Sequence, residues 1–371
     1  MPGQIAIYLI AGARPNFMKI APLWHALKPL ESRFETRIVH TGQHYDFSMS
    51  DIFLKNLGLP TPDFSLGVGS GTHGFQTGQV LIKMEQLLLQ KPPALVVVVG
   101  DVNSTIAAAL AAAKLNIPVA HIEAGLRSFD MTMPEEINRI LTDRISDLLF
   151  ASEPSGTVNL KNEGINEERV YLVGNLMIDS LKNNLREIRN NGTAEKLNLK
   201  GKKFGLVTMH RPSNVDNRPC LEVLLSILKQ AASQDELVFP IHPRTRKNLN
   251  TFGLENEFNS IKNLKMIGPV GYFDFINLMI SSSFILTDSG GIQEESTWLG
   301  IPCITLRDNT ERPLTVEKGT NRITGLDLAK VSSALDWARH FDKAGYTPPP
   351  LWDGNASKRV VQILNNFFDN R

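Results

Sequence analysis

Short apolar runs alternate along the chain with stretches in which apolar residues recur every three or four positions. The clearest run is residues 94–99, which read alanine, leucine and then four valines. An unbroken apolar run is typical of a parallel strand that helices cover on both faces. The alanine-rich residues 105–114 and the periodic residues 135–146 predict helices that follow such strands.

This strand–helix pattern fills the first half of the chain and begins again at Lys203. In the first half it further predicts a helix at 17–27 and strands at 5–11, 36–41, 118–123, 148–152 and 170–174. In the second half it predicts strands at 204–209, 237–242, 264–267, 284–288 and 303–306. Between the halves, residues 182–203 are rich in Asn, Lys and Gly and weak in apolar periodicity, which favours a connecting segment.

Two successive strand–helix series predict an α/β protein with two Rossmann-like, doubly wound domains. We expect the first domain to cover residues 1–175 and the second to cover residues 176–355. In such folds ligands bind beyond the carboxyl ends of the strands, and a cleft between two domains is the natural site. Polar residues that directly follow a predicted strand are therefore the functional candidates.

Composition narrows the class of protein. The 371 residues are enough for about two domains, and 39 Lys and Arg against 38 Asp and Glu leave a net charge of +1. This balance argues against a non-specific nucleic-acid binder or a polybasic membrane-surface protein. Two cysteines, Cys220 and Cys303, cannot make a disulfide framework. Because no signal peptide and no membrane span of about 20 apolar residues is found, we expect a cytoplasmic protein.

Residues 12–19, GARPNFMK, form the first candidate anion site, at the first strand–helix junction. A helix N-terminus carries free N–H groups and partial positive charge, and Arg14 and Lys19 would add two cations for a phosphate. The simpler interpretation is a turn with solvated side chains. No Walker loop is present.

Residues 288–296, DSGGIQEES, form a second candidate anion site at the start of another predicted helix. Ser289 can serve as the N-cap, while Gly290 and Gly291 would let a ligand approach the backbone N–H groups. A glutamate one turn later, Glu294 or Glu295, is well placed to accept the two hydroxyls of a ribose. A capped helix without a ligand would explain the serine and the glutamates but not both glycines.

Three carboxylates and one histidine are the candidates for acid–base chemistry. Asp101 ends the most apolar strand, Glu123 ends another, Glu135 begins a helix after Pro134, and His210 ends the first strand of the second half. Each has a simple structural explanation: a helix cap, half of an ion pair, ordinary helix-start chemistry, or a buried imidazole. Together they would suit proton transfer and assistance to a leaving phosphate.

Two other patterns are weaker. Residues 67–74, GVGSGTHG, superficially resemble a dinucleotide loop but follow no clear strand, so we interpret them as a flexible active-site loop. The histidines form no cluster with the spacing of a zinc site.

The motifs taken together resemble the UDP-N-acetylglucosamine 2-epimerase family, in particular its non-hydrolysing bacterial branch. They span nearly the whole chain in family order: GARPNFMKIAPL (12–23), TGQH (41–44), GDVNST (100–105), HIEAGLRS (121–128), PEEINR (134–139), MHRPSN (209–214), LTDSGGIQEE (286–295) and RDNTERP (307–313). The resemblance implies a glycosyltransferase-B-like pair of domains that form a homodimer. It also implies that a last helix, within about 356–371 and including residues 360–368, completes the first domain.

The resemblance also implies a reaction, reversible C2 epimerisation of UDP-N-acetylglucosamine to UDP-N-acetylmannosamine, for supply to surface polysaccharide synthesis. UDP is eliminated across C1 and C2 to give 2-acetamidoglucal and is then added back. The implied partners are UDP-N-acetylglucosamine and UDP, with no cofactor and no metal. Matching positions place acid–base roles on Asp101, Glu123 and Glu135, and assistance to the diphosphate on His210. The positions that match UDP-binding residues are Arg14, Lys19, Phe275, Ser289, Gly290, Gly291, Glu295 and Arg312.

The chain departs from many bacterial members at two segments that help those proteins bind a second, activating substrate molecule. Tyr45 stands where they have arginine after Gln43-His44, and Pro212-Ser213 stand where they have Arg-Glu. Losing two arginine contacts to an anion predicts weak or absent activation.

Several alternatives stay open from the sequence. A hydrolysing epimerase would release N-acetylmannosamine and UDP. An epimerase for a modified sugar such as a UDP-diacetamido-glucuronate would need an additional cation, which the sequence does not locate. A glycosyltransferase of the same fold, or an inactive UDP-sugar sensor, would not need Asp101, Glu123 and Glu135 together.

Overall fold

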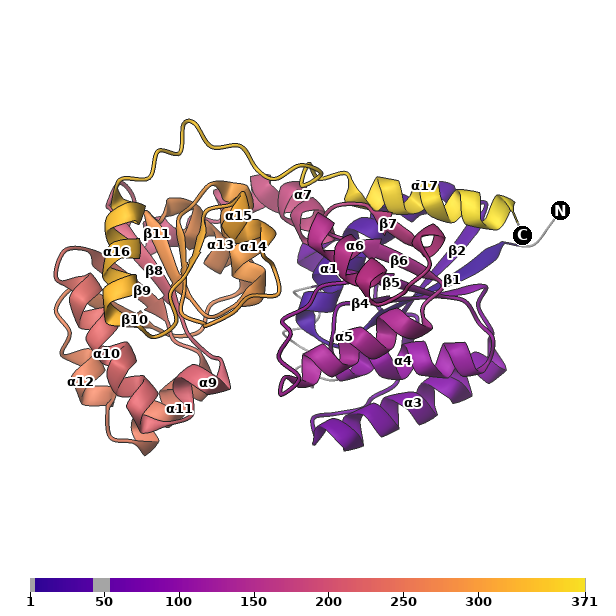
Figure 1. The fold of residues 1–371 in the computed structure, drawn as a ribbon, viewed down its shortest axis with the longest axis horizontal. Helices are drawn as coiled ribbons and strands as arrows, with labels where there is room; N and C mark the ends of the chain where they lie inside the picture. Colours follow the sequence, from indigo (N-terminus) through magenta and orange to yellow (C-terminus); the bar gives the residue numbers. More distant parts are fainter. Residues whose placement is uncertain (1–3, 43–53, 371) are drawn as a thin grey trace. The chain divides into compact units, whose positions relative to one another are not determined.

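The computed structural model describes residues 4–42 and 54–370, apart from the side chain of Arg14. The chain divides into two compact units, the first formed by Met1–Asn183 with Pro350–Arg371 and the second by Asn184–Pro349. These division points differ by a few residues from the boundaries expected at 175/176 and 355/356. The first division point lies within helix α7 (Leu176–Asn190). Each unit is an α/β layer structure, as predicted (Figure 1).

The first unit contains a seven-stranded parallel sheet in the order β3-β2-β1-β4-β5-β6-β7. Its strands are β1 (Ile5–Ala11), β2 (Phe34–His40), β3 (Phe64–Ser65), β4 (Leu95–Val99), β5 (Val119–Ile122), β6 (Leu148–Ala151) and β7 (Val170–Leu172). The helices are α1 (Arg14–Leu27), α3 (His73–Gln90), α4 (Asn103–Lys114), α5 (Pro134–Ile145), α6 (Pro154–Asn162), the start of α7, and α17 (Ala356–Asp369). Strand β4 pairs with β1 and β5 in the middle of the sheet, which explains its unbroken apolar run.

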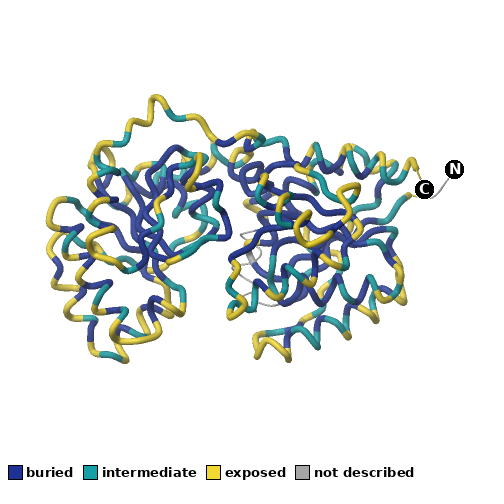
Figure 2. Tube along the Cα trace, viewed as in Figure 1, coloured by how far each residue is buried: buried dark blue, intermediate teal, exposed yellow. Residues whose placement is uncertain are grey.

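Helices α3 and α4 lie along one face of this sheet, and α1 and α17 lie along the other (Figure 1). The alanines of α4 allow a close approach, so that Ala108 and Ala112 share one buried cluster with Val96, Val98 and Met84 of α3. The buried positions follow the sheets, and exposed positions follow the loops and the outer helix faces (Figure 2).

The C-terminal helix α17 belongs to the first unit, although it is last in the sequence. Its first N–H groups, those of Ala356 and Ser357, donate to the carboxylate of Asp179 at 3.1 and 2.7 Å. At its other end Phe368 packs on Phe34 of β2, with ring centroids 5.9 Å apart. The Asp179 carboxylate therefore caps the start of α17 from a distant part of the chain. Burial raises the pKa of Asp179, although the hydrogen bonds from Ala356 and Ser357 oppose the shift.

The second unit contains a six-stranded parallel sheet in the order β10-β9-β8-β11-β12-β13. Its strands are β8 (Phe204–Thr208), β9 (Glu236–Pro240), β10 (Leu264–Ile267), β11 (Phe284–Thr287), β12 (Cys303–Thr305) and β13 (Asn321–Ile323). Its helices are the end of α7, α8 (Thr193–Lys196), α9 (Pro212–Val215), α10 (Arg218–Ala232), α11 (Pro243–Thr251), α12 (Glu255–Asn259), α13 (Tyr272–Ser281), α14 (Gly290–Leu299), α15 (Leu314–Glu317) and α16 (Leu328–Arg339). Helices α10 and α16 pack together over the buried residues of β8, β9 and β11.

Residues 182–203 contain the division between the two units at Asn183 and Asn184, as expected of a connecting segment. Much of the segment is nevertheless helical, since α7 continues to Asn190 and α8 follows it, with Ile188 buried. Residues 67–74 do follow a strand, β3, which has only two residues, and their last two positions already belong to α3. No helix in the described residues is long and apolar enough to cross a membrane.

Candidate functional site

In the first unit, the carboxyl ends of β4 and β5 place Gly100 and Glu123 side by side. The Lys19 ammonium, from α1, forms an ion pair with the Glu123 carboxylate, and both side chains are about nine-tenths buried. Gly100 has φ +66°, and a Cβ there would lie 2.9 Å from the Lys19 Nζ and 3.3 Å from the Glu123 Oε2. Glycine is favoured here, because a side chain would be strained in this backbone conformation and would displace the Lys19 head group.

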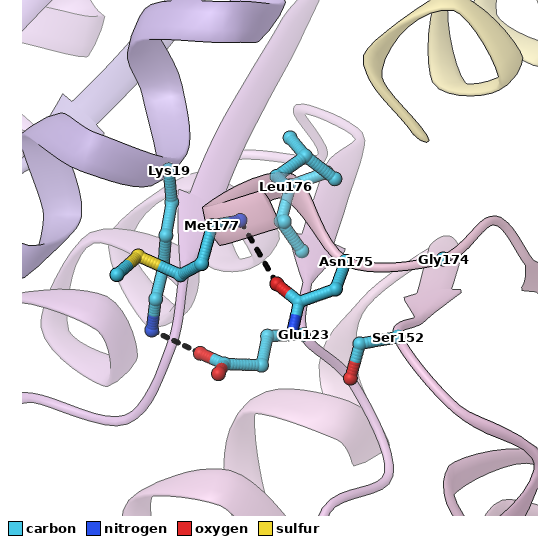
Figure 3. A pocket seen from close by; sticks show the side chains of 8 residues that line it. Lys19, Glu123, Ser152, Gly174, Asn175, Leu176 and Met177 are labelled. Atoms are coloured by element: carbon cyan, nitrogen blue, oxygen red, sulfur yellow. Dashed lines mark hydrogen bonds and ion pairs between the residues drawn. The ribbon is translucent and has the colours of Figure 1, made fainter. Parts of the chain in front are cut away.

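Glu123 itself has φ +73°, a left-handed conformation that costs an ordinary residue about 1–2 kcal/mol. Its backbone N–H donates to Phe150 O at 3.0 Å in the neighbouring strand, which holds it in place. Strain that the surrounding structure enforces is common at functional sites. The conformation directs the carboxylate toward Lys19 (Figure 3).

A small pocket adjoins this ion pair. It is lined by Lys19, Ile122, Glu123, Ser152, Gly174, Asn175, Leu176 and Met177 (Figure 3). Asn175 is already engaged, since its amide oxygen accepts the Met177 N–H at 2.8 Å. The buried Ser152 hydroxyl has no hydrogen-bond partner among the described residues. The pocket therefore offers an ammonium, a carboxylate and a hydroxyl to a polar ligand.

Asp101, the residue after Gly100, is held by α5. Its Oδ2 lies 2.7 Å from the Nη2 of Arg139, whose other Nη pairs with Glu136 at 2.5 Å. Glu136 is buried and also accepts the backbone N–H groups of Ser128 and Phe129. In the sequence, Glu136 and Arg139 are only part of the motif at 134–139; in the structure, Arg139 pairs with Asp101 and with Glu136 and so orients Asp101.

Glu135 stands beside Glu136 in the first turn of α5 and is partly exposed. Its carboxylate makes no ion pair or hydrogen bond with any residue that the structure describes. Of the two adjacent acids, Glu135 therefore has the accessible carboxylate, because the Glu136 carboxylate is buried and bound to Arg139, Ser128 and Phe129.

In the second unit, His210 follows β8 and Asp288 follows the adjacent strand β11. The His210 Nδ1 lies 3.1 Å from Asp288 Oδ1, and Asp288 also accepts the backbone N–H groups of His210 and Arg211. Burial alone would raise the pKa of Asp288, but these hydrogen bonds and the His210 charge lower it. The carboxylate therefore fixes the imidazole and leaves the other ring nitrogen of His210, which is about one-third exposed, for a ligand.

The ring of His242 lies 5.5 Å from that of His210, centroid to centroid. Burial and the neighbouring His210 lower the pKa of His242. A neutral second imidazole here limits charge repulsion if His210 is protonated.

Ser289 occupies the N-cap position of α14, but its side chain makes no capping hydrogen bond. A Cβ on Gly290 would meet the Arg312 Nη1 at 2.6 Å, whereas a Cβ on Gly291 would meet nothing within 4 Å. The first glycine thus admits Arg312 against the helix, and the second leaves open space at the helix N-terminus. This end of α14 has the features of an anion site.

Arg312 is held below the helix by two buried carboxylates. Its Nε lies 2.9 Å from Glu294 Oε2, and its Nη1 lies 2.5 Å from Glu311 Oε1. Arg307 adds a second guanidinium on Glu311 at 2.9 Å. Buried pairs of this kind fix geometry well, because removing one partner would leave an uncompensated charge.

Glu295, one turn into α14, is fully buried and accepts the Tyr272 hydroxyl at 2.7 Å. Burial raises the pKa of Glu295 to about 8, although the Tyr272 hydrogen bond opposes the shift. Phe275 lies on the same helix as Tyr272, α13, and is partly buried. The sequence pointed to Glu295 but not to Tyr272, since nothing in the local pattern links the two helices.

Some expected residues lie outside the described part of the chain: the Arg14 side chain, Gln43, His44 and Tyr45. Within residues 4–42 and 54–370 no group of three or more His, Cys, Asp or Glu residues could hold a metal ion.

Comparison with known proteins identifies the family. The model of the family described as UDP-N-acetylglucosamine 2-epimerase matches residues 27–365. This chain belongs to the UDP-N-acetylglucosamine 2-epimerase family. The resemblance seen in the sequence is thereby confirmed at the level of the family.

Individual members of this family match over nearly their whole length. A UDP-N-acetylglucosamine 2-epimerase homolog from Methanococcus maripaludis is 47% identical over 364 residues, 97% of this chain and 99% of the relative. UDP-2,3-diacetamido-2,3-dideoxy-D-glucuronate 2-epimerase from Pseudomonas aeruginosa is 44% identical over 364 residues, 96% of this chain and 99% of the relative. The crystal structure of Methanocaldococcus jannaschii UDP-GlcNAc 2-epimerase in complex with UDP-GlcNAc and UDP superimposes with a TM-score of 0.90. It is 43% identical and covers 98% of this chain and 100% of that chain.

For this member of the epimerase family, the structure groups the expected residues into two sets. The first set lies in the first unit, at or near strand ends and helix starts, and consists of Lys19, Asp101, Glu123 and Glu135. The second set lies in the second unit and consists of His210, Phe275, Ser289, Gly290, Gly291, Glu295 and Arg312. The supporting residues Arg139, Glu136, Asp288 and Glu311 stood in the sequence only within motifs, with no supporting role predicted for them, and Tyr272 was not singled out. Their pairings join segments far apart in the sequence, so no local pattern carries them.

Proposed function

We propose that the protein is a non-hydrolysing UDP-N-acetylglucosamine 2-epimerase, which interconverts UDP-N-acetylglucosamine and UDP-N-acetylmannosamine. Membership of the epimerase family supports the reaction type, and the solved relative in complex with UDP-GlcNAc and UDP supports the substrate class. The observation that carries the proposal is the pair of oriented carboxylates, Asp101 on Arg139 and Glu123 on Lys19, at neighbouring strand ends.

The proposed chemistry is elimination followed by re-addition. One carboxylate removes the C2 proton while the C1–O bond breaks and UDP leaves with the bonding electrons, giving 2-acetamidoglucal. Another carboxyl group then protonates C2 on the opposite face, and a diphosphate oxygen of UDP forms the C1–O bond again. We assign the two proton transfers to members of the set Asp101, Glu123 and Glu135.

We assign most of the UDP contacts to the second unit, with Arg14 of the first unit as a further contact. The open N-terminus of α14 at Gly291 suits the diphosphate, and Arg312 adds positive charge beside it. His210, held by Asp288, is suited to protonate or polarise the departing phosphate oxygen. Glu295 is proposed to accept the ribose hydroxyls, with Phe275 near the uracil.

The experiment that tests this function is incubation with UDP-N-acetylglucosamine in deuterated water, followed by proton NMR. The expected result is loss of the C2 proton signal while UDP remains attached to the sugar. Free UDP that accumulates in a one-to-one ratio with sugar turnover would instead establish a hydrolysing epimerase. Absence of C2 exchange would reject epimerisation of this sugar.

Asp101→Asn should abolish C2 exchange and leave UDP binding, measured by calorimetry, largely intact. The amide keeps the size of the side chain but cannot accept a proton at neutral pH. Arg14→Ala should instead weaken UDP binding. If both variants lose only binding, the division of roles between these residues is wrong.

The name of one relative makes a second nucleotide sugar a candidate substrate. The 44% identical protein from Pseudomonas aeruginosa is named as an epimerase for UDP-2,3-diacetamido-2,3-dideoxy-D-glucuronate. Parallel exchange assays with the two nucleotide sugars at equal concentration separate the candidates. We expect a higher kcat/KM for UDP-N-acetylglucosamine, and the opposite order would reassign the substrate.

We also propose that the substrate does not activate this enzyme at a second site, because both arginines expected for that role are replaced. The reverse reaction from pure UDP-N-acetylmannosamine should therefore start without a lag. A lag that traces of UDP-N-acetylglucosamine remove would contradict this expectation.

A further inference from the structure

His121, the third residue of β5, is completely buried two positions before Glu123. Both of its ring nitrogens have a close partner. Nδ1 lies 2.7 Å from the Asp143 Oδ1 on α5, and Nε2 lies 2.8 Å from the backbone oxygen of Gly100 at the end of β4. A peptide oxygen and an ionised carboxylate can only accept hydrogen bonds, so each ring nitrogen must supply a proton.

Asp143 is surrounded by donors. Besides His121, its carboxylate accepts the Gly125 N–H at 3.1 Å and forms an ion pair with Arg127 at 2.7 Å. Arg127 is in turn paired with Glu163, which is about one-third exposed. Burial alone would raise the pKa of Asp143, but His121 and Arg127 lower it. With a cationic His121 this chain of four groups is neutral, since two positive charges face two negative charges.

The far side of the imidazole leads to the proposed reaction centre. The Gly100 oxygen that His121 contacts belongs to the peptide group that continues into Asp101. The head groups of Lys19 and Glu123 lie next to Gly100, since a Cβ there would be 2.9 Å from the Lys19 Nζ and 3.3 Å from the Glu123 Oε2. His121 thus joins α5 to the turn from which Asp101 projects and against which Glu123 rests.

We propose that His121 donates hydrogen bonds from both ring nitrogens, to Asp143 and to the Gly100 oxygen, and acts as a positioning residue for Asp101 and Glu123. Its two hydrogen bonds fix the β4 turn at Gly100 relative to β5 and α5. This inference rests on the proposed function for the roles of the two carboxylates, whereas the protonation of His121 does not depend on it.

The protonation is tested by NMR of the full-length protein labelled with 15N in histidine, with His121→Gln used to assign the signal. Both ring nitrogens of His121 should carry protons at neutral pH, since each faces an acceptor oxygen. A ring nitrogen without a proton at neutral pH would overturn the proposal. Either that nitrogen and its partner oxygen would both be acceptors, or Asp143 would have to carry the proton.

The positioning role is tested with Asp143→Asn, which keeps the size of the partner but removes its charge. We expect the kcat of C2 exchange to fall about 100-fold with KM for the nucleotide sugar nearly unchanged, since a displacement of about 1 Å at a catalytic group has such an effect. His121→Gln, which keeps one donor toward Gly100, should lose less activity than His121→Leu, which keeps none.

The matched control is His25→Gln. His25 lies on α1 of the same unit, and its Nε2 contacts the Leu57 oxygen at 2.8 Å, away from the carboxylates. Its kcat should match that of the wild type. Equal activity of His121→Leu and His25→Gln would overturn the positioning role. If the wild-type protein fails to exchange C2, the proposed function and the positioning role both fail, while the ring-nitrogen signals still decide the protonation.

Discussion

At the scale of single residues, the candidate site is built from charges whose partners are buried. Asp101, Glu123 and Arg312 each project from a strand end or loop that the sequence pattern located, but their orientation depends on Arg139, Lys19 and Glu294. Breaking a buried pair of this kind typically costs about 3–5 kcal/mol, because the remaining charge loses its compensation. Substitutions of the supporting residues should therefore impair folding as well as activity.

Glu295 gives a prediction of stability against pH. Its pKa in the folded protein is raised by burial to about 8, from an ordinary value of 4.5. The protonated carboxyl therefore favours the folded state most below pH 4.5, and this contribution is lost as the pH rises to about 8. Glu295→Gln is always neutral, so its thermal midpoint should rise relative to that of the wild type across this range.

The measurement is a set of paired thermal melts at constant ionic strength. Since all other groups titrate alike in both proteins, the difference between the two midpoints isolates Glu295. A constant difference from pH 4.5 to pH 8 would mean that this carboxyl is ionised throughout in the folded protein.

At the scale of elements, helix starts concentrate the chemistry. The N-termini of α1, α5 and α14 hold Arg14, Glu135 and Gly290, and each follows a strand of a parallel sheet directly or after a loop. The parallel arrangement brings these ends to one edge of each sheet. The first two glycines of α14 differ most clearly in their surroundings, because Gly290 lies against Arg312 and Glu311 whereas Gly291 faces open space.

Gly291→Ala should fold at least as stably as the wild type but bind UDP more weakly. Alanine favours a helix over glycine by up to about 1 kcal/mol, and its methyl group would enter open space where we place the diphosphate. Calorimetric titration with UDP and thermal unfolding measure the two effects.

Gly290→Ala is the matched control, because its methyl group would meet Arg312 and Glu311 at less than 3 Å. It should lower the thermal midpoint, unlike Gly291→Ala. If Gly291→Ala and the wild type bind UDP with equal affinity, the diphosphate does not bind at this end of α14.

At the scale of the whole molecule, the homodimer implied by the family resemblance stays a prediction. Helix α3 exposes Phe75, Ile82 and Leu89, with exposed fractions of 57%, 50% and 65%. A spacing of seven residues places all three on one side of the helix. An apolar stripe of this kind is what a second copy of the chain would cover.

Ile82→Glu should shift the molar mass in size-exclusion chromatography with light scattering from that of a dimer toward that of a monomer. Ser226→Glu adds the same charge at an exposed position of α10 and should leave the mass unchanged. A wild-type protein that elutes as a monomer at micromolar concentration would refute the dimer.

Much of the fold was determined by the sequence alone. The apolar runs located nearly all strands of both sheets because strands buried on both faces contain little else, and glycine and charge at strand ends located most site residues. The tertiary structure decided the rest: the short strands β3 and β13 and the helical course of residues 182–196. The place of α17 in the first unit was implied by the family resemblance and not by the local pattern. The tertiary structure also selected Glu136 over Glu135 as the buried acid and joined His121, Asp143 and Gly100. These depend on contacts between distant segments, whose energies no local pattern of residues records.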